Sequence, residues 1–285
     1  MDVEERANLV FSRSLKKLDR RKVNILGIGV DVVDYSSATD RIAEAARLKQ
    51  TYSVSALAVH GVVSGVLDKE LGERINSLDM VCPDGQPVRW AMNLMGKAGL
   101  SDRVYGPTLT LRVCEMAARE GLGVFLFGST DEVLSKLADN LKKRFPELRI
   151  CGSQPSRFRQ ITDEERDQDL GTIRDSKASI TLVGLGCPRQ EVWVFEMADK
   201  LEMPCLAVGA AFDFHAGLLP MAPEWMQNTG LEWLYRLAQE PKRLWRRYLC
   251  LNTLYVFLIM AQILRLRKFA PRTRGAEPLP ELRYG

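Results

Sequence analysis

Four loops of this chain combine glycine with residues that can bind a phosphate or move a proton. They read CPDGQPVRWA (82–91), FGST (127–130), GLGCPRQE (184–191) and GAAFDFHAG (209–217). Each follows an apolar run of strand length. Glycine after a strand lets backbone N–H groups approach a phosphate, and the N-terminus of a following helix adds a favourable dipole. The loops therefore suit a sugar nucleotide or a dinucleotide, although each glycine could equally serve a tight turn between strand and helix.

The loop at 184–191 breaks the glycine fingerprint of dinucleotide-binding enzymes. Gly184 and Gly186 have the spacing of the first two glycines, but Arg189 occupies the third position, where close helix–strand packing needs glycine. This disfavours a nucleotide-dependent oxidoreductase, which is kept as the alternative enzyme class. Binding of UDP without binding of NAD(P) would separate the two classes.

The sequence predicts no metal ion and no other cofactor. Asp167 and Asp169 form a D-x-D pair of the kind that holds a metal in many sugar-nucleotide transferases, but they lie in the highly charged stretch 162–171. Such a stretch is typical of a solvated helix face. With only His60 and His215 as histidines, and no clustered cysteines, a His/Cys zinc site is not expected.

Apolar runs of strand length alternate with amphipathic segments of helix length. Strands are expected within 24–33, 52–59, 80–82, 123–128, 179–186 and 204–212, and helices within 37–50, 131–145 and 188–201. Ser129 with Glu132, and Thr162 with Glu165, have the spacing of capping boxes and predict two helix starts. The alternation predicts an α/β fold with a mostly parallel sheet. Ligands of such sheets bind outside the carboxyl ends of the strands, where the four loops lie.

The positive charge is concentrated near the end of the chain. Residues 236–274 hold ten cations and one anion, Glu240, a charge of +9, whereas the chain carries +4 in total and therefore −5 elsewhere. A basic end on an acidic body predicts a negatively charged partner for that end alone. The six cysteines are scattered without a C-x-x-C pair, and no long apolar run near the N-terminus marks the chain for export. Both features favour a cytosolic location.

An uncharged apolar stretch, LCLNTLYVFLIMAQIL at 249–264, follows the arginine cluster directly. Its 16 residues would extend about 24 Å as a helix, short of the ~30 Å hydrocarbon core of a bilayer. We therefore expect this stretch to lie on a membrane surface. A re-entrant or spanning helix, and burial in an oligomer, are the alternatives.

Taken together, these motifs resemble the WecG/TagA/CpsF family of bacterial glycosyltransferases. The resemblance rests on PDG at 83–85 followed by WA at 90–91, DRVYG at 102–106, GLGCPRQE at 184–191, VGAAFDFHAG at 208–217 and GLEWLYRLAQEPKRLWRRY at 230–248. It covers roughly residues 23–250 and implies a Rossmann-like catalytic domain with a C-terminal helical appendage that approaches a lipid. The expected divisions are an N-terminal extension (1–22), the catalytic domain (23–222), the appendage (223–270) and a disordered tail (271–285).

The resemblance also implies a reaction and its partners. Family members move a sugar, with inversion and without a required metal, from a UDP-sugar to a sugar on undecaprenyl diphosphate at the cytoplasmic membrane face. The expected partners are thus a UDP-sugar, a polyprenyl-diphosphate-linked acceptor and the membrane surface; no nucleic acid is expected, and a homo-oligomer is left open. Glucose and N-acetylmannosamine-type donors are both admissible. The alternative outside enzymes is an inactive scaffold that recruits polysaccharide-assembly enzymes through its basic end.

The resemblance assigns roles residue by residue. Asp84 matches the base that accepts the proton of the acceptor hydroxyl, Arg103 a cation near the leaving diphosphate, and Gln190 an amide that orients a sugar or phosphate oxygen. Judged from its neighbours alone, Asp84 could equally order the turn between Pro83 and Gly85.

Further contacts are expected around these three residues. Those with donor or acceptor are assigned to His60, Gly85, Gly186 and Asp213. Those with the lipid diphosphate are assigned to Arg236, Arg243 and Arg246. His60 stands where many members have asparagine, and Pro220 and Met221 stand where members often have two cations, so the donor sugar is left open.

Overall fold

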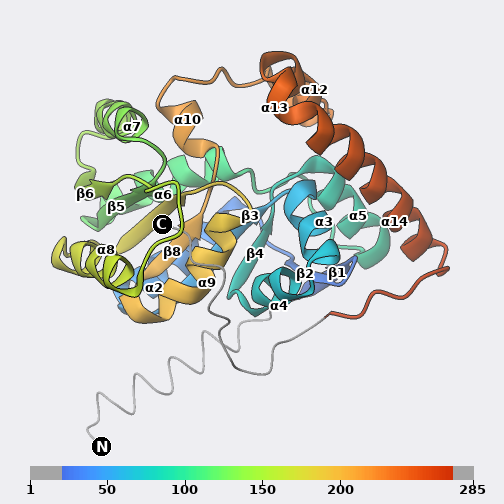
Figure 1. Cartoon of the computed structure of the whole chain (residues 1–285), viewed down its shortest axis with the longest axis horizontal. Coiled ribbons are helices and arrows are strands. Elements are labelled where there is room, and N and C mark those ends of the chain that lie inside the picture. The colour runs from blue at the N-terminus through green and yellow to red at the C-terminus, as the bar shows by residue number, and fades with distance from the viewer. Residues whose placement is uncertain (1–20, 272–285) are drawn as a thin grey trace, which may run out of the picture.

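A six-stranded parallel sheet forms the centre of the molecule (Figure 1). The computed structural model describes residues 21–271, so the predicted tail and most of the predicted N-terminal extension lie outside the described residues. The strand order is β4-β3-β8-β7-β5-β6. The strands are β3 (Tyr52–Leu57), β4 (Met80–Pro83), β5 (Gly123–Gly128), β6 (Arg149–Gln154), β7 (Ile180–Gly184) and β8 (Pro204–Ala207). The predicted mostly parallel, Rossmann-like sheet is confirmed.

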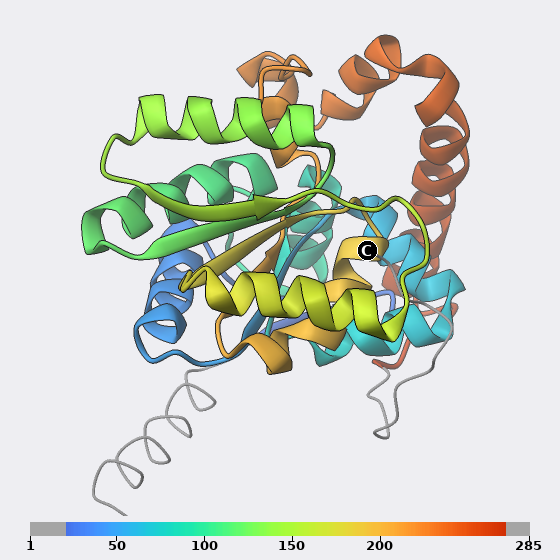
Figure 2. The same cartoon turned by 60° about the vertical axis from the view of Figure 1, so that its left-hand side comes forward.

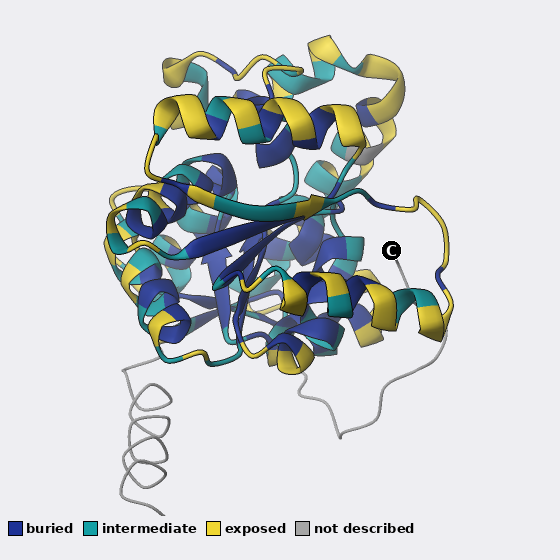
Figure 3. Cartoon of the chain, turned by 90° about the vertical axis from the view of Figure 1, so that its left-hand side faces the viewer, coloured by how far each residue is buried: buried dark blue, intermediate teal, exposed yellow. Residues whose placement is uncertain are grey.

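Helices cover both faces of this sheet (Figure 2). One face packs against α2 (Tyr35–Arg47), α6 (Gly106–Glu120), α7 (Asp131–Arg144) and α10 (Ala211–His215). The other packs against α3 (Val59–Leu67), α4 (Lys69–Ser77), α5 (Gln86–Gly96), α8 (Asp163–Asp175) and α9 (Arg189–Leu201). Leu126 and Phe127, consecutive in β5, belong to opposite layers because side chains alternate along a strand. The strands are accordingly buried, except for the edge strand β6, whereas the helices expose their outer faces (Figure 3).

The expectation of a single strand within 24–33 is wrong. Two short strands, β1 (Lys22–Ile25) and β2 (Ile28–Asp31), form an antiparallel hairpin apart from the main sheet. Leu26 and Gly27 both have positive φ, 56° and 90°, and this backbone makes the two-residue turn. The apolar side chains of the hairpin join the core on the α3–α5 side of the sheet.

One of the two predicted helix starts is confirmed. Thr162 caps α8, and its hydroxyl accepts from the N–H of Glu165 in a reciprocal capping box. The start at Ser129 is wrong, because Ser129 lies at φ 59° and Thr130 is the residue that caps α7 by accepting from the N–H of Val133.

The predicted C-terminal helical region is present and runs beside α3 and α5 (Figure 1). It comprises α11 (Glu224–Asn228), α12 (Glu232–Gln239), α13 (Pro241–Arg246), a π-helical segment η1 (Arg247–Asn252) and α14 (Thr253–Ile263). Over residues 21–271, no helix combines the length and apolar character needed to cross a membrane.

One face of α14 is part of the core. Tyr255 and Ile259 are buried, and the Tyr255 hydroxyl donates to the carbonyl oxygen of Pro87 at 3.1 Å. The Gln262 amide accepts from the N–H of Leu26 at 2.9 Å and donates to a carbonyl oxygen of β1. This face of the stretch 249–264 therefore packs against the body of the protein.

The opposite face of α14 is apolar and exposed. Its exposed apolar side chains are Val256, Phe257 and Met260, followed by Leu264, and Thr253 is exposed at its start. Phe257 is 69% exposed, which is unusual for a large aromatic side chain in a folded domain. The helix thus has one face packed on the body and one apolar face open.

Candidate active site

A cavity of about 480 Å³ lies at the carboxyl ends of the strands. The loops after all six strands of the sheet line it, together with side chains from α12, α13 and η1. All four loops singled out by their glycines contribute lining residues. The expected meeting of these loops at one edge of the sheet is confirmed, because the strands that precede them run parallel.

Asp84 lies directly after β4, facing the N-terminus of α6. Its carboxylate accepts from the N–H of Gly106 at 3.4 Å. A side chain at Gly106 would come within 3.2 Å of the Val208 carbonyl oxygen, so glycine permits this close approach. Burial raises the pKa of Asp84 to about 7, with Arg103 opposing the rise and Glu232 adding to it. A carboxyl group with a pKa near neutrality is suited to accept a proton during catalysis.

Arg103 is buried beside this carboxyl group and is held by Glu232 of α12. Its Nη2 donates to Glu232 Oε2 at 2.6 Å. The guanidinium also lies 3.9 Å from the centroid of the Tyr105 ring, and the Tyr105 hydroxyl donates to Glu232 Oε1 at 2.6 Å. Sequence reasoning missed Glu232. The signal available was its place in GLEWLYR, a motif from which only the arginine was used.

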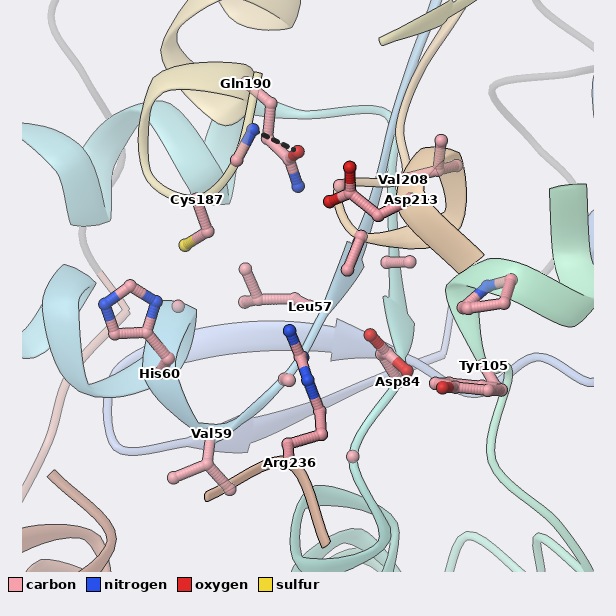
Figure 4. Close-up of a pocket in the computed structure, with 18 of the residues that line it drawn as sticks. Leu57, Val59, His60, Asp84, Tyr105, Cys187, Gln190, Val208, Asp213 and Arg236 are labelled. Atoms are coloured by element: carbon pink, nitrogen blue, oxygen red, sulfur yellow. Dashed lines mark hydrogen bonds between the residues drawn. The ribbon is translucent and has the colours of Figure 1, made fainter. Parts of the chain in front are cut away.

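Gln190 lines the cavity, but its amide is engaged within its own loop. Its Oε1 accepts from the N–H of Gly186 at 3.2 Å, the bond drawn in Figure 4, and its Nε2 donates to Glu191 at 2.9 Å. The Ser55 hydroxyl donates to the same Glu191 oxygen at 3.0 Å. Burial raises the pKa of Glu191, a second site residue that sequence reasoning did not single out. The predicted glutamine thus orders the loop that faces the cavity.

His60, Gly85 and Asp213 also line the cavity, as do Gly186 and Arg236 (Figure 4). His60 lies in the first turn of α3 rather than at the end of a strand. Asp213 belongs to α10. Burial raises its pKa, whereas the positive charges of Arg243 and Arg236 lower it.

Only two of the three arginines predicted to bind the lipid diphosphate line the cavity. Arg236 and Arg243 line the cavity, and Figure 4 shows the Arg236 side chain reaching into it. Arg246 is exposed, does not belong to the lining, and lies 5.2 Å from the Trp245 ring. Pro241 begins a new helix, as predicted, and Arg246 lies at the far end of that helix.

The D-x-D pair lies away from this cavity, on α8. Asp167 is exposed, as expected for a solvated face, but for Asp169 that expectation is wrong. Asp169 is buried, accepts from Arg157 at 2.8 Å and also pairs with Gln154. Within residues 21–271, no group of three or more His, Cys, Asp or Glu side chains is placed to hold a metal.

One known protein family matches nearly all of the residues that the structure describes. The family model of the glycosyl transferase WecG/TagA/CpsF family matches residues 23–269. The chain belongs to this family. It is therefore a glycosyltransferase, and membership implies work in cell-wall polysaccharide biosynthesis with a nucleotide-sugar donor and a lipid-linked acceptor.

The cavity contains the groups that glycosyl transfer requires. A base must take the proton of the attacking hydroxyl, and cations or N–H groups must stabilise the diphosphate that leaves. Asp84 can serve as the base. Arg103, Arg236 and Arg243 supply positive charge around the cavity, and α9 begins at its wall with its N-terminal dipole.

Proposed function

We propose that the chain is an inverting UDP-sugar-dependent hexosyltransferase. It would transfer the sugar to a polyprenyl-diphosphate-linked sugar on the cytoplasmic face of the bacterial inner membrane, in the assembly of a surface or exopolysaccharide. The observation that carries the proposal is a buried carboxyl group with a raised pKa, Asp84, in a cavity that also contains arginines from the C-terminal helices. The exposed apolar face of α14 supports the membrane side of the proposal.

In the proposed reaction, Asp84 accepts the proton of the acceptor hydroxyl as its oxygen bonds to the anomeric carbon. The bond from that carbon to the UDP oxygen breaks at the same time, and UDP leaves with the electron pair from the opposite face of the sugar. A single displacement of this kind inverts the configuration. The arginines stabilise the charge that develops on the diphosphate.

The proposed position of the nucleobase is beside Phe158. This side chain lines the cavity, is 56% exposed and lies 5.9 Å from the guanidinium of Arg189. It comes from the loop after β6, and Thr130 and Gly186, from the loops after the neighbouring strands β5 and β7, line the same cavity. An exposed ring next to a guanidinium is suited to stack on a planar base. This position would leave the sugar directed toward Asp84.

Phe158→Ala is therefore expected to raise the KM for the UDP-sugar about 5- to 100-fold, because stacking on a base is worth about 1–3 kcal/mol. Turnover at saturating donor should change little, since the ring does not touch the reacting atoms. Initial rates over a range of donor concentrations measure both. Phe158→Tyr keeps a stacking surface and is the control; a KM that is the same in all three proteins would remove Phe158 from the donor site.

Arg243→Ala is expected to affect the acceptor more than Arg246→Ala. Arg243 lines the cavity and Arg246 does not, so only the first can contact a diphosphate there. A charge-assisted hydrogen bond contributes about 1.5–3 kcal/mol, which corresponds to a roughly 10- to 100-fold higher KM for the lipid-linked acceptor. UDP affinity, measured by calorimetry, should stay near wild type in Arg246→Ala. Equal effects of the two substitutions on the acceptor would contradict this assignment.

The function is tested by incubating the purified protein with a panel of UDP-sugars and short-chain polyprenyl-diphosphate-linked sugars and measuring UDP release. Donor-dependent release with formation of a disaccharide lipid is expected. An inactive scaffold would release no UDP with any pair. A panel is needed because His60 and the uncharged Pro220 and Met221 alter positions at which the family often has asparagine and two cations.

A further inference from the structure

We infer that Glu232 is a positioning residue for sugar transfer, through which α12 holds Arg103 and Tyr105 beside Asp84. The inference rests on the proposed function of this cavity. By this inference, the C-terminal helices help to position the residues around the base, Asp84, as well as contacting the lipid-linked acceptor.

The geometry of Glu232 is that of a two-point clamp. It is the first residue of α12, and its side chain is 12% exposed. Each carboxylate oxygen accepts one bond of 2.6 Å, from Arg103 Nη2 and from the Tyr105 hydroxyl. Two charge-assisted bonds to one buried carboxylate fix both donors more firmly than either bond alone.

The two donors belong to the segment that also supports the base. Residues 102–106 lead from β4 and α5 into α6, and the N–H of Gly106 at the end of this segment donates to Asp84. The backbone N–H of Val104 donates to the carbonyl oxygen of Pro83 at 2.8 Å, which ties the segment to the residue before Asp84. Glu232 therefore holds the same short segment at Arg103 and Tyr105, the residues on either side of Val104.

Arg103 stays available to a substrate in this arrangement. The bond to Glu232 uses one of the five N–H donors of the guanidinium, and the Tyr105 ring supports one face of it. Pairing with Glu232 also offsets the cost of burying an arginine charge that would otherwise lack a partner when no diphosphate is bound. Glu232 can thus hold Arg103 ready for a phosphate oxygen.

Glu232 also acts on Asp84 through its charge. The charged and titratable groups around Asp84 are Arg103, Tyr105, Glu232, Arg236, Tyr35 and Cys82. Arg103 and Arg236 lower the pKa of Asp84, whereas Glu232 raises it. Without the negative charge of Glu232, the charge of Arg103 would be uncompensated, and Asp84 would be a weaker base at neutral pH.

Glu232→Gln tests this directly, because it keeps the size of the side chain and one acceptor oxygen but removes the charge. We expect the acidic limb of the kcat/KM profile to move about one unit toward lower pH, as for loss of a nearby like charge. We also expect kcat/KM at pH 8 to fall about tenfold or more. Glu224→Gln removes the same charge from the exposed surface of neighbouring α11 and should leave both quantities at the wild-type values.

A second readout does not need turnover. Carboxyl ¹³C NMR of aspartate-labelled protein, with the Asp84 signal assigned by its loss in Asp84→Asn, should give a lower Asp84 pKa in Glu232→Gln than in the wild type. Tyr105→Phe, which removes one of the two donors and keeps the ring, should fold even if Glu232→Gln does not, and should lower kcat/KM with a smaller shift of the Asp84 titration. A pKa of Asp84 that is unchanged or higher in Glu232→Gln would overturn the inference.

The two readouts separate the inference from the proposed function. If the wild type transfers sugar but Glu232→Gln keeps the wild-type pH profile and titration, the positioning role is wrong and the transferase proposal stands. If no UDP-sugar is consumed but the Asp84 signal shifts in Glu232→Gln, the influence of Glu232 on Asp84 stands and the reaction assigned to the cavity is wrong.

Discussion

Asp84→Asn is expected to lower turnover by about 10²-fold or more while leaving UDP affinity close to that of the wild type. The amide keeps the shape of the carboxyl group but cannot accept the proton of the acceptor hydroxyl, and loss of a general base typically costs 10²- to 10⁴-fold in rate, roughly. Single-turnover transfer to a lipid-linked acceptor measures the chemical step, and calorimetry with UDP measures binding. Asp84 faces the N–H of Gly106, so the neutral variant also keeps an acceptor for that bond.

The pH dependence of the wild type should follow from the same residue. Because Asp84 must be deprotonated to act as a base and its pKa is raised to about 7, kcat/KM is expected to rise with pH through about 7 and then level off. The folded state holds this proton more tightly than the unfolded state does. Its contribution to stability is therefore present at low pH and lost as pH rises toward 7. Asp84→Asn should lack the acidic limb and melt no lower than wild type at pH 8.

Wild-type turnover in Asp84→Asn would place the base elsewhere. His60 and Asp213 are then the residues to substitute, since both line the cavity and the pKa of Asp213 is also raised by burial. Loss of folding would appear as a lower melting temperature, which separates it from loss of chemistry.

The parallel sheet could be predicted from sequence because its strands are buried on both faces and therefore read as continuous apolar runs. β6 was not predicted, because it is the edge strand and its polar residues Arg149 and Ser153 are exposed, so that its sequence is not a continuous apolar run. The hairpin at 22–31 was read as one strand, because the run 24–33 is apolar on both sides of its turn. The turn that divides it needs a positive φ at Leu26 as well as at Gly27, and a leucine does not signal such a backbone.

The centre of the site could be predicted because it depends on local order along the chain. Asp84 comes directly after β4 and Gly186 two residues after β7, and parallel strands bring such positions to one edge of the sheet. Glu232 could not be found in this way. Its role depends on how α12 packs across the loop at 102–106, more than 120 residues earlier in sequence. Helical spacing placed Arg246 with Arg243, but although both lie on α13, only Arg243 lines the cavity.

The two faces of α14 are expected to respond oppositely to substitution. Ile259→Ala removes a buried side chain from the core and should lower the free energy of unfolding by about 2–4 kcal/mol. Phe257→Ser with Met260→Ser changes only exposed side chains and should leave that free energy within about 0.5 kcal/mol of wild type. Urea unfolding followed by circular dichroism measures both.

Binding to vesicles should show the reverse order. Sedimentation with vesicles containing phosphatidylglycerol should be near wild type for Ile259→Ala at a temperature where it is folded. For Phe257→Ser with Met260→Ser it should be about tenfold weaker or more, because partial insertion of each side chain contributes about 1–2 kcal/mol. Truncation before residue 249 could not separate vesicle binding from stability, because it would also remove Tyr255 from the core.

The outcome decides what covers this face. If the doubly substituted protein binds vesicles as tightly as the wild type, a membrane is not the partner of the exposed face of α14. A second copy of the chain then becomes the occupant to test, because a 69% exposed phenylalanine beside an exposed methionine is an apolar surface that association would bury. Analytical ultracentrifugation of the wild type and the doubly substituted protein would show that case directly, as a dimer present in the first and absent from the second.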